Sequence, residues 1–239
     1  MTVDFHSHIL PRMDDGSSSA VESAEMLRLE AEQGIRTVVL TPHFDPGRDD
    51  PRRFLERREA ALSRMPSDLP EQPELRLGAE VYFFRGMSDS DALHDLAVTN
   101  SRCIMVEMPP PPWPESYYRE LEQIYLKQAL TPVIAHIDRY ITPLRTHQIP
   151  QRLSQLPVAI QANAEFFLNR RTANFALKML NAGHIHLLGS DCHNLTDRSP
   201  NIGPALARIR IKLGDSPILR LQSNAQFLLC QSDSRSVPQ

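Results

Sequence analysis

The chain opens with the stretch that decides its fold: residues 3–8 read Val3-Asp4-Phe5-His6-Ser7-His8. The run Val3–His6 predicts a short strand, and the two histidines stand at its carboxyl end. Side chains of a strand alternate between two faces, so His6 and His8 point the same way and can bind one metal ion. We therefore expect a first strand that delivers metal-binding side chains at its end.

Short apolar or β-branched runs of the same kind recur along the chain, and longer amphipathic stretches separate them. The seven expected strands are Val3–His6, Thr37–Thr41, Leu75–Phe83, Cys103–Met108, Pro132–His136, Val158–Asn163 and His186–Ser190. The expected helices are Ala20–Gln33, Arg52–Arg64, Glu115–Gln128, Arg171–Asn181 and Pro204–Leu213. This alternation predicts parallel strands joined by helical crossovers, and seven strands favour a closed or nearly closed α/β barrel.

The helix expected over Ala20–Gln33 has the clearest end signals. Ser19 and Glu22 have the spacing of a capping box at its start. Gly34 is a typical residue at a helix C-terminus. We therefore expect this helix to begin after Ser19 and to stop before Gly34.

Composition excludes several classes of protein. The chain has 239 residues with 26 basic and 29 acidic side chains, a formal net charge of −3, and 41% hydrophobic residues. It can therefore bury a core, and it lacks the basic stripe of a nucleic-acid-binding protein. Three scattered cysteines, no visible signal peptide and no apolar run of about 18 residues favour a cytoplasmic protein without membrane insertion. We expect one domain over residues 1–230 and a disordered polar tail over residues 231–239.

Histidines and acids recur where the expected strands end. These side chains are His6, His8, Asp14 or Asp15, His43, Glu80, Glu107, His136, Asp191 and His193. The carboxyl ends of the strands of a βα barrel share one face, where functional sites are built. The set therefore predicts a metal centre, and imidazole with carboxylate ligands suits Mn²⁺, Fe or Zn²⁺. The spacing to Gly16 favours Asp15 over Asp14 without excluding Asp14.

A second His-x-His pair, His184 and His186, has a different interpretation. It opens the seventh expected strand, five residues before Asp191 and roughly 16 Å from it at ~3.3 Å per residue. That position lies near the opposite end of a barrel, so we expect these histidines to be structural or exposed.

The motifs together resemble the polymerase-and-histidinol-phosphatase (PHP) superfamily, and within it the bacterial manganese-dependent protein-tyrosine phosphatases of the CpsB/YwqE type. The matching segments are Asp4–Pro11, Asp14–Gly16, Ala31–Ile35, Thr41–His43, Gly78–Glu80, His136–Tyr140 and Ser190–Asn194. They span nearly the whole chain. The family usually has Pro-Glu where this chain has Ile137-Asp138, and alanine where it has Cys192. Neither departure falls on an expected ligand.

The resemblance implies a distorted TIM-like (β/α)7 barrel and three divalent ions, with manganese favoured. His6, His8 and Asp191 would hold the first ion, Glu80 would bridge it to a second held by Glu107 and His136, and Asp15, His43 and His193 would hold the third. The implied partner is a bacterial tyrosine autokinase that controls capsule or exopolysaccharide synthesis. The oligomeric state stays open.

Hydrolysis of a phosphate monoester needs a nucleophile at neutral pH and neutralisation of charge. A hydroxide held between two cations meets the first need. Arginine binds phosphoryl oxygens in pairs, and Arg139 and Arg198 lie close in sequence to expected ligands. We assign both to catalysis and phosphate binding, and we expect Tyr140 and Phe44 at the mouth of the substrate site.

Three alternatives accompany this interpretation. Residues 192–199 spell a cysteine, five residues, then Arg198 and Ser199, which is the pattern of cysteine-dependent tyrosine phosphatases. Asp191 would raise the pKa of Cys192, and the loop has no glycine to let backbone amides converge on phosphate, so the metal mechanism is favoured. The remaining alternatives are a small-molecule PHP phosphatase of the histidinol-phosphate type and a non-catalytic metal-binding module.

Overall fold

The computed structural model describes residues 2–66, 73–141 and 148–230. Its strands are β1 (Val3–Ser7), β2 (Thr37–Leu40), β3 (His43–Phe44), β4 (Glu74–Leu77), β5 (Glu80–Tyr82), β6 (Cys103–Glu107), β7 (Thr131–Ile134), β8 (Ala159–Asn163) and β9 (Leu187–Gly189). Its α-helices are α1 (Ala20–Glu32), α2 (Pro51–Ser63), α3 (Leu93–Leu96), α4 (Glu115–Gln128), α5 (Gln148–Leu153), α6 (Ala164–Leu168), α7 (Ala173–Asn181), α8 (Ile202–Leu213) and α9 (Ser216–Leu229).

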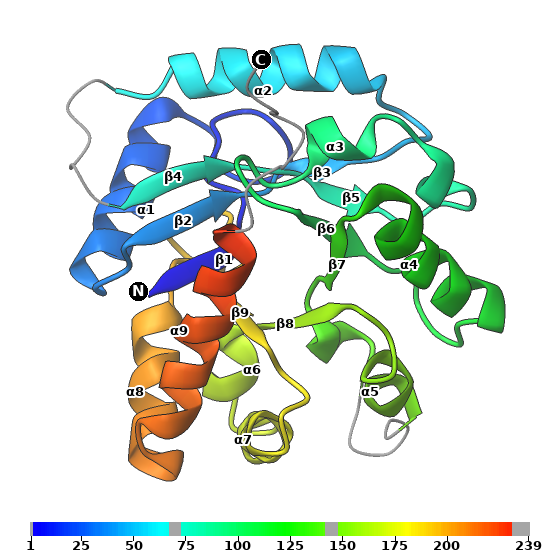
Figure 1. Ribbon diagram of the computed structural model, residues 1–239. Helices are drawn as coiled ribbons and strands as arrows, with labels where there is room; N and C mark the ends of the chain where they lie inside the picture. Colours follow the sequence, from blue (N-terminus) through cyan, green and yellow to red (C-terminus); the bar gives the residue numbers. More distant parts are fainter. Residues whose placement is uncertain (1, 67–72, 142–147, 231–239) are drawn as a thin grey trace, which may run out of the picture.

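All strand pairs in this part of the chain are parallel, as expected from the alternation of strands and helices. One sheet has the order β1-β2-β4, and the other has the order β3-β5-β6-β7-β8-β9. Figure 1 shows the strands as a curled wall with the helices outside it. The expected α/β barrel of TIM-like type is confirmed in this curled form.

One expected strand ends a residue early and is followed by a short strand that was not expected, and a second expected strand is interrupted. The strand expected over Thr37–Thr41 stops at Leu40, and β3 begins after Pro42, which has no N–H to donate. The strand expected over Leu75–Phe83 is interrupted at Gly78 and Ala79. Hydrogen bonds from Gly78 N to Leu40 O and from Glu80 N to Pro42 O carry the pairing across both breaks. The two sheets therefore follow one another around a single wall.

The first and last strands meet beside the predicted centre. Asp191 N donates to His6 O at 2.8 Å, and His8 N donates to Cys192 O at 2.9 Å. These bonds continue the parallel contact of β1 with the chain that follows β9. Residues 6–8 and 191–193, far apart in the sequence, are thus held side by side.

The helix predictions hold with small shifts at the ends. The side chain of Ser19 accepts a hydrogen bond from Glu22 N, and Gly34 has φ 79°, a conformation that glycine tolerates without strain. Helix α4 has the expected bounds. Helices α3, α5, α6 and α9 were not expected, and α9 is the longest of these, lying beside β1 and β9 (Figure 1).

The core has two parts. Alternate residues of the strands, among them Phe5, Val39 and Met105, form one cluster together with Leu228 of α9. A larger cluster fills the layer between strands and helices and includes Phe54 and Phe167. In the described residues, no helix is both long and apolar enough to cross a membrane.

Candidate metal centre

The fold brings every predicted metal ligand to one end of the barrel wall. The contributing segments are the ends of β1 (His6, His8), the loop before α1 (Asp15), β3 (His43), β5 (Glu80), β6 (Glu107), and the chain after β7 (His136) and β9 (Asp191, His193). His43 and Glu80 are the first residues of β3 and β5, which continue the wall after the breaks that follow β2 and β4. The other side chains lie at the carboxyl ends of parallel strands or in the loops beside them. The side chains form three overlapping groups.

The first group centres on His6 and His8. Their Nε2 atoms lie 3.0 Å apart, and Glu80 Oε2 lies 3.1 Å from His6 Nε2 and 3.2 Å from His8 Nε2. Asp191 Oδ1 is 3.7 Å from His6 Nε2 and 3.5 Å from His8 Nε2. All four side chains are buried. Two imidazoles and two carboxylates thus point at one another around a space for an ion.

The second group shares Glu80 with the first. His136 Nε2 lies 2.7 Å from Glu80 Oε1 and 3.5 Å from Glu107 Oε1. His43 Nδ1 is 3.1 Å from Glu80 Oε2 and 3.8 Å from Glu107 Oε2. One Glu80 oxygen therefore faces the first group and the other faces His136, the arrangement of a bridging carboxylate.

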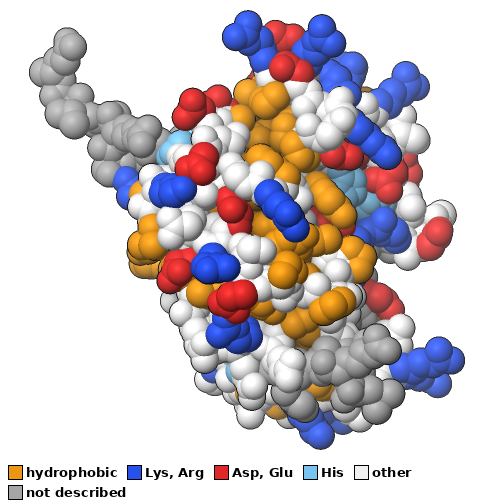
Figure 2. All heavy atoms as spheres, turned by 90° about the vertical axis from the view of Figure 1, so that its right-hand side faces the viewer, with side chains coloured by type: hydrophobic (Ala, Val, Ile, Leu, Met, Phe, Trp, Pro, Cys, Tyr) orange, Lys and Arg blue, Asp and Glu red, His pale blue; other side chains and the backbone are white. Residues whose placement is uncertain are grey.

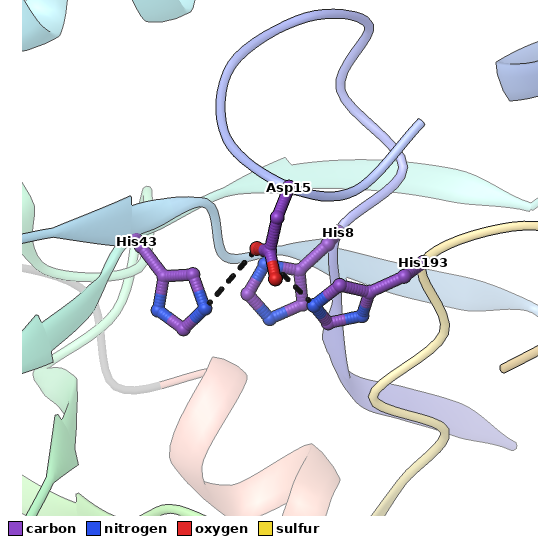
Figure 3. Close-up of side chains that lie close together, drawn as sticks. All are labelled: His8, Asp15, His43 and His193. Carbon is purple, nitrogen blue, oxygen red and sulfur yellow. Dashed lines mark ion pairs between the residues drawn. The ribbon is translucent and has the colours of Figure 1, made fainter. Parts of the chain in front are cut away.

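The third group lies at the open mouth of the site. Asp15 Oδ1 is 3.6 Å from His43 Nε2 and 3.5 Å from His193 Nε2. Figure 3 shows these two ion pairs as dashed lines. His8 lies beside both histidines, its ring centroid 4.5 Å from that of His43 and 4.0 Å from that of His193. The Asp15 side chain is 67% exposed, whereas that of His193 is 3% exposed. This group is the most exposed of the three.

Asp14 and Asp15 have different roles in this geometry. Asp14 Oδ2 lies 2.8 Å from His8 Nδ1 and accepts a hydrogen bond from His43 N, and Asp14 Oδ1 accepts one from Gly16 N. A carboxylate behind a histidine fixes its tautomer and leaves the other ring nitrogen for a metal. The loop fits because Gly16 has no side chain: a Cβ there would lie 2.2 Å from His8 O. Asp15 points into the centre, and Asp14 orients His8.

The donor set suits a metal ion. His193 Nε2 is buried and has no hydrogen-bond partner within the described residues, although it faces Asp15 and His43. Burial lowers the pKa of His193 to about 4 and lowers the pKa of His43 and His136, so these rings are held neutral, as metal ligation requires. Burial, with the charge of Glu80, raises the pKa of Glu107 to about 7.

Two of the predicted ligands have an unusual backbone conformation. His136 has φ 30° and Asp191 has φ 53°, both in the left-handed region that L-residues seldom adopt. Such conformations are often retained where function requires them. Both follow the last residue of a strand within two positions, so the turn points their side chains into the centre.

Gln161 on β8 contacts ligand-type residues of the first and second groups, and the sequence analysis did not predict this role. Its Oε1 accepts from His136 N at 2.5 Å and lies 3.2 Å from His6 Nδ1. Its Nε2 donates to Asn163 Oδ1, and Asn163 Nδ2 donates to Asp191 Oδ2. The Gln161-x-Asn163 spacing at a strand end was the available signal, since it repeats that of His6 and His8.

Both predicted phosphate-binding arginines reach the rim of the centre. Arg139 Nη2 lies 2.6 Å from Asp191 Oδ2, and Arg198 Nη2 lies 2.8 Å from Asp191 Oδ1. Arg139 Nη1 is also 3.6 Å from Glu107 Oε1. Their side chains are 41% and 38% exposed, so both remain open to a ligand.

Of the two aromatic residues expected at the mouth, Phe44 lies in the core and Tyr140 lies beside Arg139. Phe44 is 3% exposed and packs its ring against Phe54 in the core, so its side chain offers no surface to a substrate. Tyr140 is 7% exposed, and its hydroxyl accepts a hydrogen bond from Met108 N. Tyr140 still lines a groove beside Arg139.

The cysteine mechanism does not fit this geometry. Cys192 is fully buried, and burial together with Asp4 and Glu30 raises the pKa of its thiol well above its usual range. The amides of Thr196 and Arg198 donate to Asn194 Oδ1 rather than converging on an open cradle. The chain therefore lacks a thiolate nucleophile at this position.

The second histidine pair lies outside the centre, as expected. His186 Nδ1 accepts a hydrogen bond from Ile160 N at the beginning of β8. Ile160 directly precedes Gln161 on β8, so it lies further from the carboxyl end of the strand. His186 therefore supports the backbone of β8.

Known proteins match this chain over nearly its whole length. A family described as capsular polysaccharide synthesis, CpsB/CapC, matches residues 2–229. The tyrosine-protein phosphatase YwqE of Bacillus subtilis is 29% identical over 95% of this chain and 91% of its own, and CpsB of Streptococcus pneumoniae is 27% identical over 89% and 91%.

Solved structures show the same fold. Crystal structures of YwqE and CpsB, described as metal-dependent tyrosine phosphatases, match with a TM-score of 0.82 at 26% identity, over 100% of this chain and 98% of that chain. Histidinol phosphate phosphatase from Lactococcus lactis, solved with zinc, matches with a TM-score of 0.52 at 14% identity over 95% and 92%. The second likeness concerns the fold alone.

Proposed function

This chain belongs to the capsular polysaccharide synthesis family CpsB/CapC, and from that premise we propose that it is a metal-dependent protein-tyrosine phosphatase. The observation that carries the proposal is the convergence of nine ligand-type side chains, with Arg139 and Arg198 at their rim. A similar fold alone does not require these ligand-type side chains together with the two arginines, so their combination points to phosphatase activity. We include residues 1–230 in the catalytic domain.

The three groups fit three divalent ions, and we propose manganese. His6, His8 and Asp191 would hold one ion, Glu107 and His136 a second, with Glu80 between them, and Asp15, His43 and His193 a third. When bound, such ions lower the pKa of water to give a nucleophile at neutral pH and neutralise phosphoryl oxygens. Asp14 and Gln161 would keep His8 and His6 in the tautomers that ligation needs.

The arginines provide the rest of the phosphate site. A monoester dianion carries charge on oxygens that a guanidinium binds in pairs, and both Arg139 and Arg198 end beside Asp191. Their contacts with Asp191 hold them in place before substrate arrives. A tyrosyl phenolate leaves with a pKa near ~10, so the reaction depends less on a general acid than an alkyl ester would.

The substrate that this family suggests is a phosphotyrosyl protein of the capsule or exopolysaccharide system, and we propose a bacterial tyrosine autokinase. Its phosphorylated tyrosines would reach the exposed third group first, since Asp15 lies at the open mouth. We place the reaction in the cytoplasm, which agrees with three free cysteines.

The experiment that tests the proposal couples metal content to turnover. Purified protein is assayed with p-nitrophenyl phosphate, a phosphotyrosyl peptide and histidinol phosphate, with and without Mn²⁺ and after chelation, and its metals are measured by elemental analysis. We expect chelation to abolish turnover, Mn²⁺ to restore it, and Cys192→Ser to retain it.

Three results would contradict the proposal. Turnover that survives chelation and is lost in Cys192→Ser would restore the cysteine mechanism. A preference for histidinol phosphate over the phosphotyrosyl peptide would make the chain a small-molecule phosphatase. Less than one metal per chain without turnover would make it a binding module.

A further inference from the structure

A groove of about 810 Å³ adjoins the candidate metal centre. Its walls come from the chain after β6, the start of α4, the turn after β7 and helix α5. These segments follow β6, which ends at Glu107, and β7, which is followed by His136, so groove and centre share one end of the barrel. Figure 2 looks onto the side where α4 and α5 lie, and a band of hydrophobic side chains crosses it.

Arg139 joins the groove to the centre. It lines the groove, and its Nη2 lies 2.6 Å from Asp191 Oδ2. Tyr140, the next residue, lines the groove as well and has its ring 5.6 Å from that of His136. A phosphotyrosine gripped by Arg139 would therefore have the residues beside it in the chain at the groove.

The side chains of the groove wall are held in place by contacts with one another and with the backbone. Trp113 Nε1 donates to Pro109 O at 2.7 Å, and its ring packs edge-on against Tyr140 at 5.1 Å. On the other side, the Arg152 guanidinium lies 5.2 Å over the ring of Tyr118. Fixed aromatic walls with polar groups at the rim are typical of ligand sites.

The rim has the chemistry that a peptide backbone needs. Gln148, Gln151 and Gln155 line the groove at intervals of three and four residues, so they share one side of α5 and the turn that follows it. Each exposed amide offers both a donor and an acceptor, as a peptide group does. A groove of this volume is also too large for a phosphoryl group alone.

We propose that this groove binds the polypeptide segment that flanks the phosphotyrosine, which makes the site selective for phosphotyrosyl peptides over small phosphate monoesters. The inference rests on the proposed phosphatase function. The edges of Trp113 and Tyr140 that line the groove contact the side chains of this segment, and the glutamines bind its backbone. Small esters occupy only the metal centre and Arg139.

The test fills the groove without touching the centre. Manganese-loaded wild type, Gln151→Trp and the control Gln226→Trp, an exposed glutamine of α9, are assayed with p-nitrophenyl phosphate, free phosphotyrosine and a short phosphotyrosyl peptide. We expect wild type to prefer the peptide over free phosphotyrosine by at least about tenfold in kcat/KM, or about 1.4 kcal/mol. Gln151→Trp should lose that preference with p-nitrophenyl phosphate turnover unchanged, and Gln226→Trp should keep it.

The outcomes separate the two proposals. No preference in wild type, a preference that survives in Gln151→Trp, or equal losses for all substrates in a folded variant would overturn the groove. Gln155→Trp fills the same groove from the next turn. If Gln151→Trp does not fold, the same assays on Gln155→Trp test whether the peptide preference depends on the groove. Failure of wild type to turn over any substrate would instead overturn the phosphatase function itself.

Discussion

Gln161 contacts two of the predicted ligands without entering the candidate metal centre. Its Oε1 accepts a hydrogen bond from His136 N and lies 3.2 Å from His6 Nδ1, and the proposed ion assignment places these two histidines at different ions. We expect Gln161→Ala to weaken metal binding by about 10- to 100-fold, as losses behind ligands usually do. Turnover at saturating Mn²⁺ should fall much less, because the ligands themselves remain.

The measurement is p-nitrophenyl phosphate turnover as a function of Mn²⁺ concentration, with Gln226→Ala as the control on exposed α9. The midpoint should move to higher Mn²⁺ in Gln161→Ala only. A curve that coincides with wild type would show that Gln161 does not position these ligands.

At this scale the sequence predicted the ligand-type side chains but not their supports. His6-x-His8 and Asp191-x-His193 have a residue chemistry that identifies them. Gln161 is an amide, which is seldom a metal ligand, and its partners lie 155 and 25 residues away. The choice of Asp15 over Asp14 likewise needed the packing of Gly16 on His8.

At the scale of elements, we expect the contact of Glu30 on α1 with Asp4 on β1 to make the stability of the fold depend on pH. Glu30 is fully buried, and neither of its oxygens receives a hydrogen bond within the described residues. Burial and then the charge of Asp4 raise its pKa well above the usual range. The folded state therefore keeps a proton that the unfolded state releases above its ordinary pKa of about 4.3.

The sign follows from that difference. Between the unfolded and folded pKa values the native state binds more protons, so this group lowers stability as pH rises, by up to about 1.4 kcal/mol per pH unit. Glu30→Gln removes the ionisation and keeps the shape. We expect its stability relative to wild type to increase from pH 6 to pH 8, measured by urea unfolding with saturating Mn²⁺.

Glu32→Gln, exposed on the same helix, is the matched control and should show no such trend. Since metal ligands titrate alike in the three proteins, their contribution cancels in the differences. A Glu30→Gln difference that stays constant with pH would mean that Glu30 is ionised in the folded protein.

The elements themselves were predicted where local patterns decide them. Ser19 and Gly34 mark the two ends of α1, and the sequence predicted both because a capping interaction involves residues within one turn of the helix. The break at Gly78 lies inside a run that the sequence pattern favours as one strand, and Pro42 follows directly on another, so only the pairing around the wall places both breaks. Helix α9 carries a helical pattern, with Ile218, Leu221 and Ala225 at intervals of three and four residues, so this helix could have been predicted from the sequence.

For the whole molecule, the candidate centre lies where the two ends of the barrel wall meet. Its ligand-type residues extend from residue 6 to residue 193, and β1 meets β9 and the segment after it through backbone bonds and through the bonds of Ser190 to Asp4. Gly189 has no room for a side chain there, since a Cβ would lie 2.6 Å from His6 Cβ. Ions held by Asp191, His6 and Glu80 together would cross-link β1, β5 and the segment after β9.

Metal removal should therefore lower the stability of the entire fold. An ion that binds only the folded state adds about 2.7 kcal/mol at a hundredfold excess over its Kd, which for a domain of this size is a Tm increase of about 5 to 11 °C. We expect that increase when Mn²⁺ is added to chelated protein, by thermal unfolding. His193→Ala should reduce it and His184→Ala should not, since His184 lies before β9, away from the centre. An unchanged Tm would mean that these side chains hold the wall together without any ion.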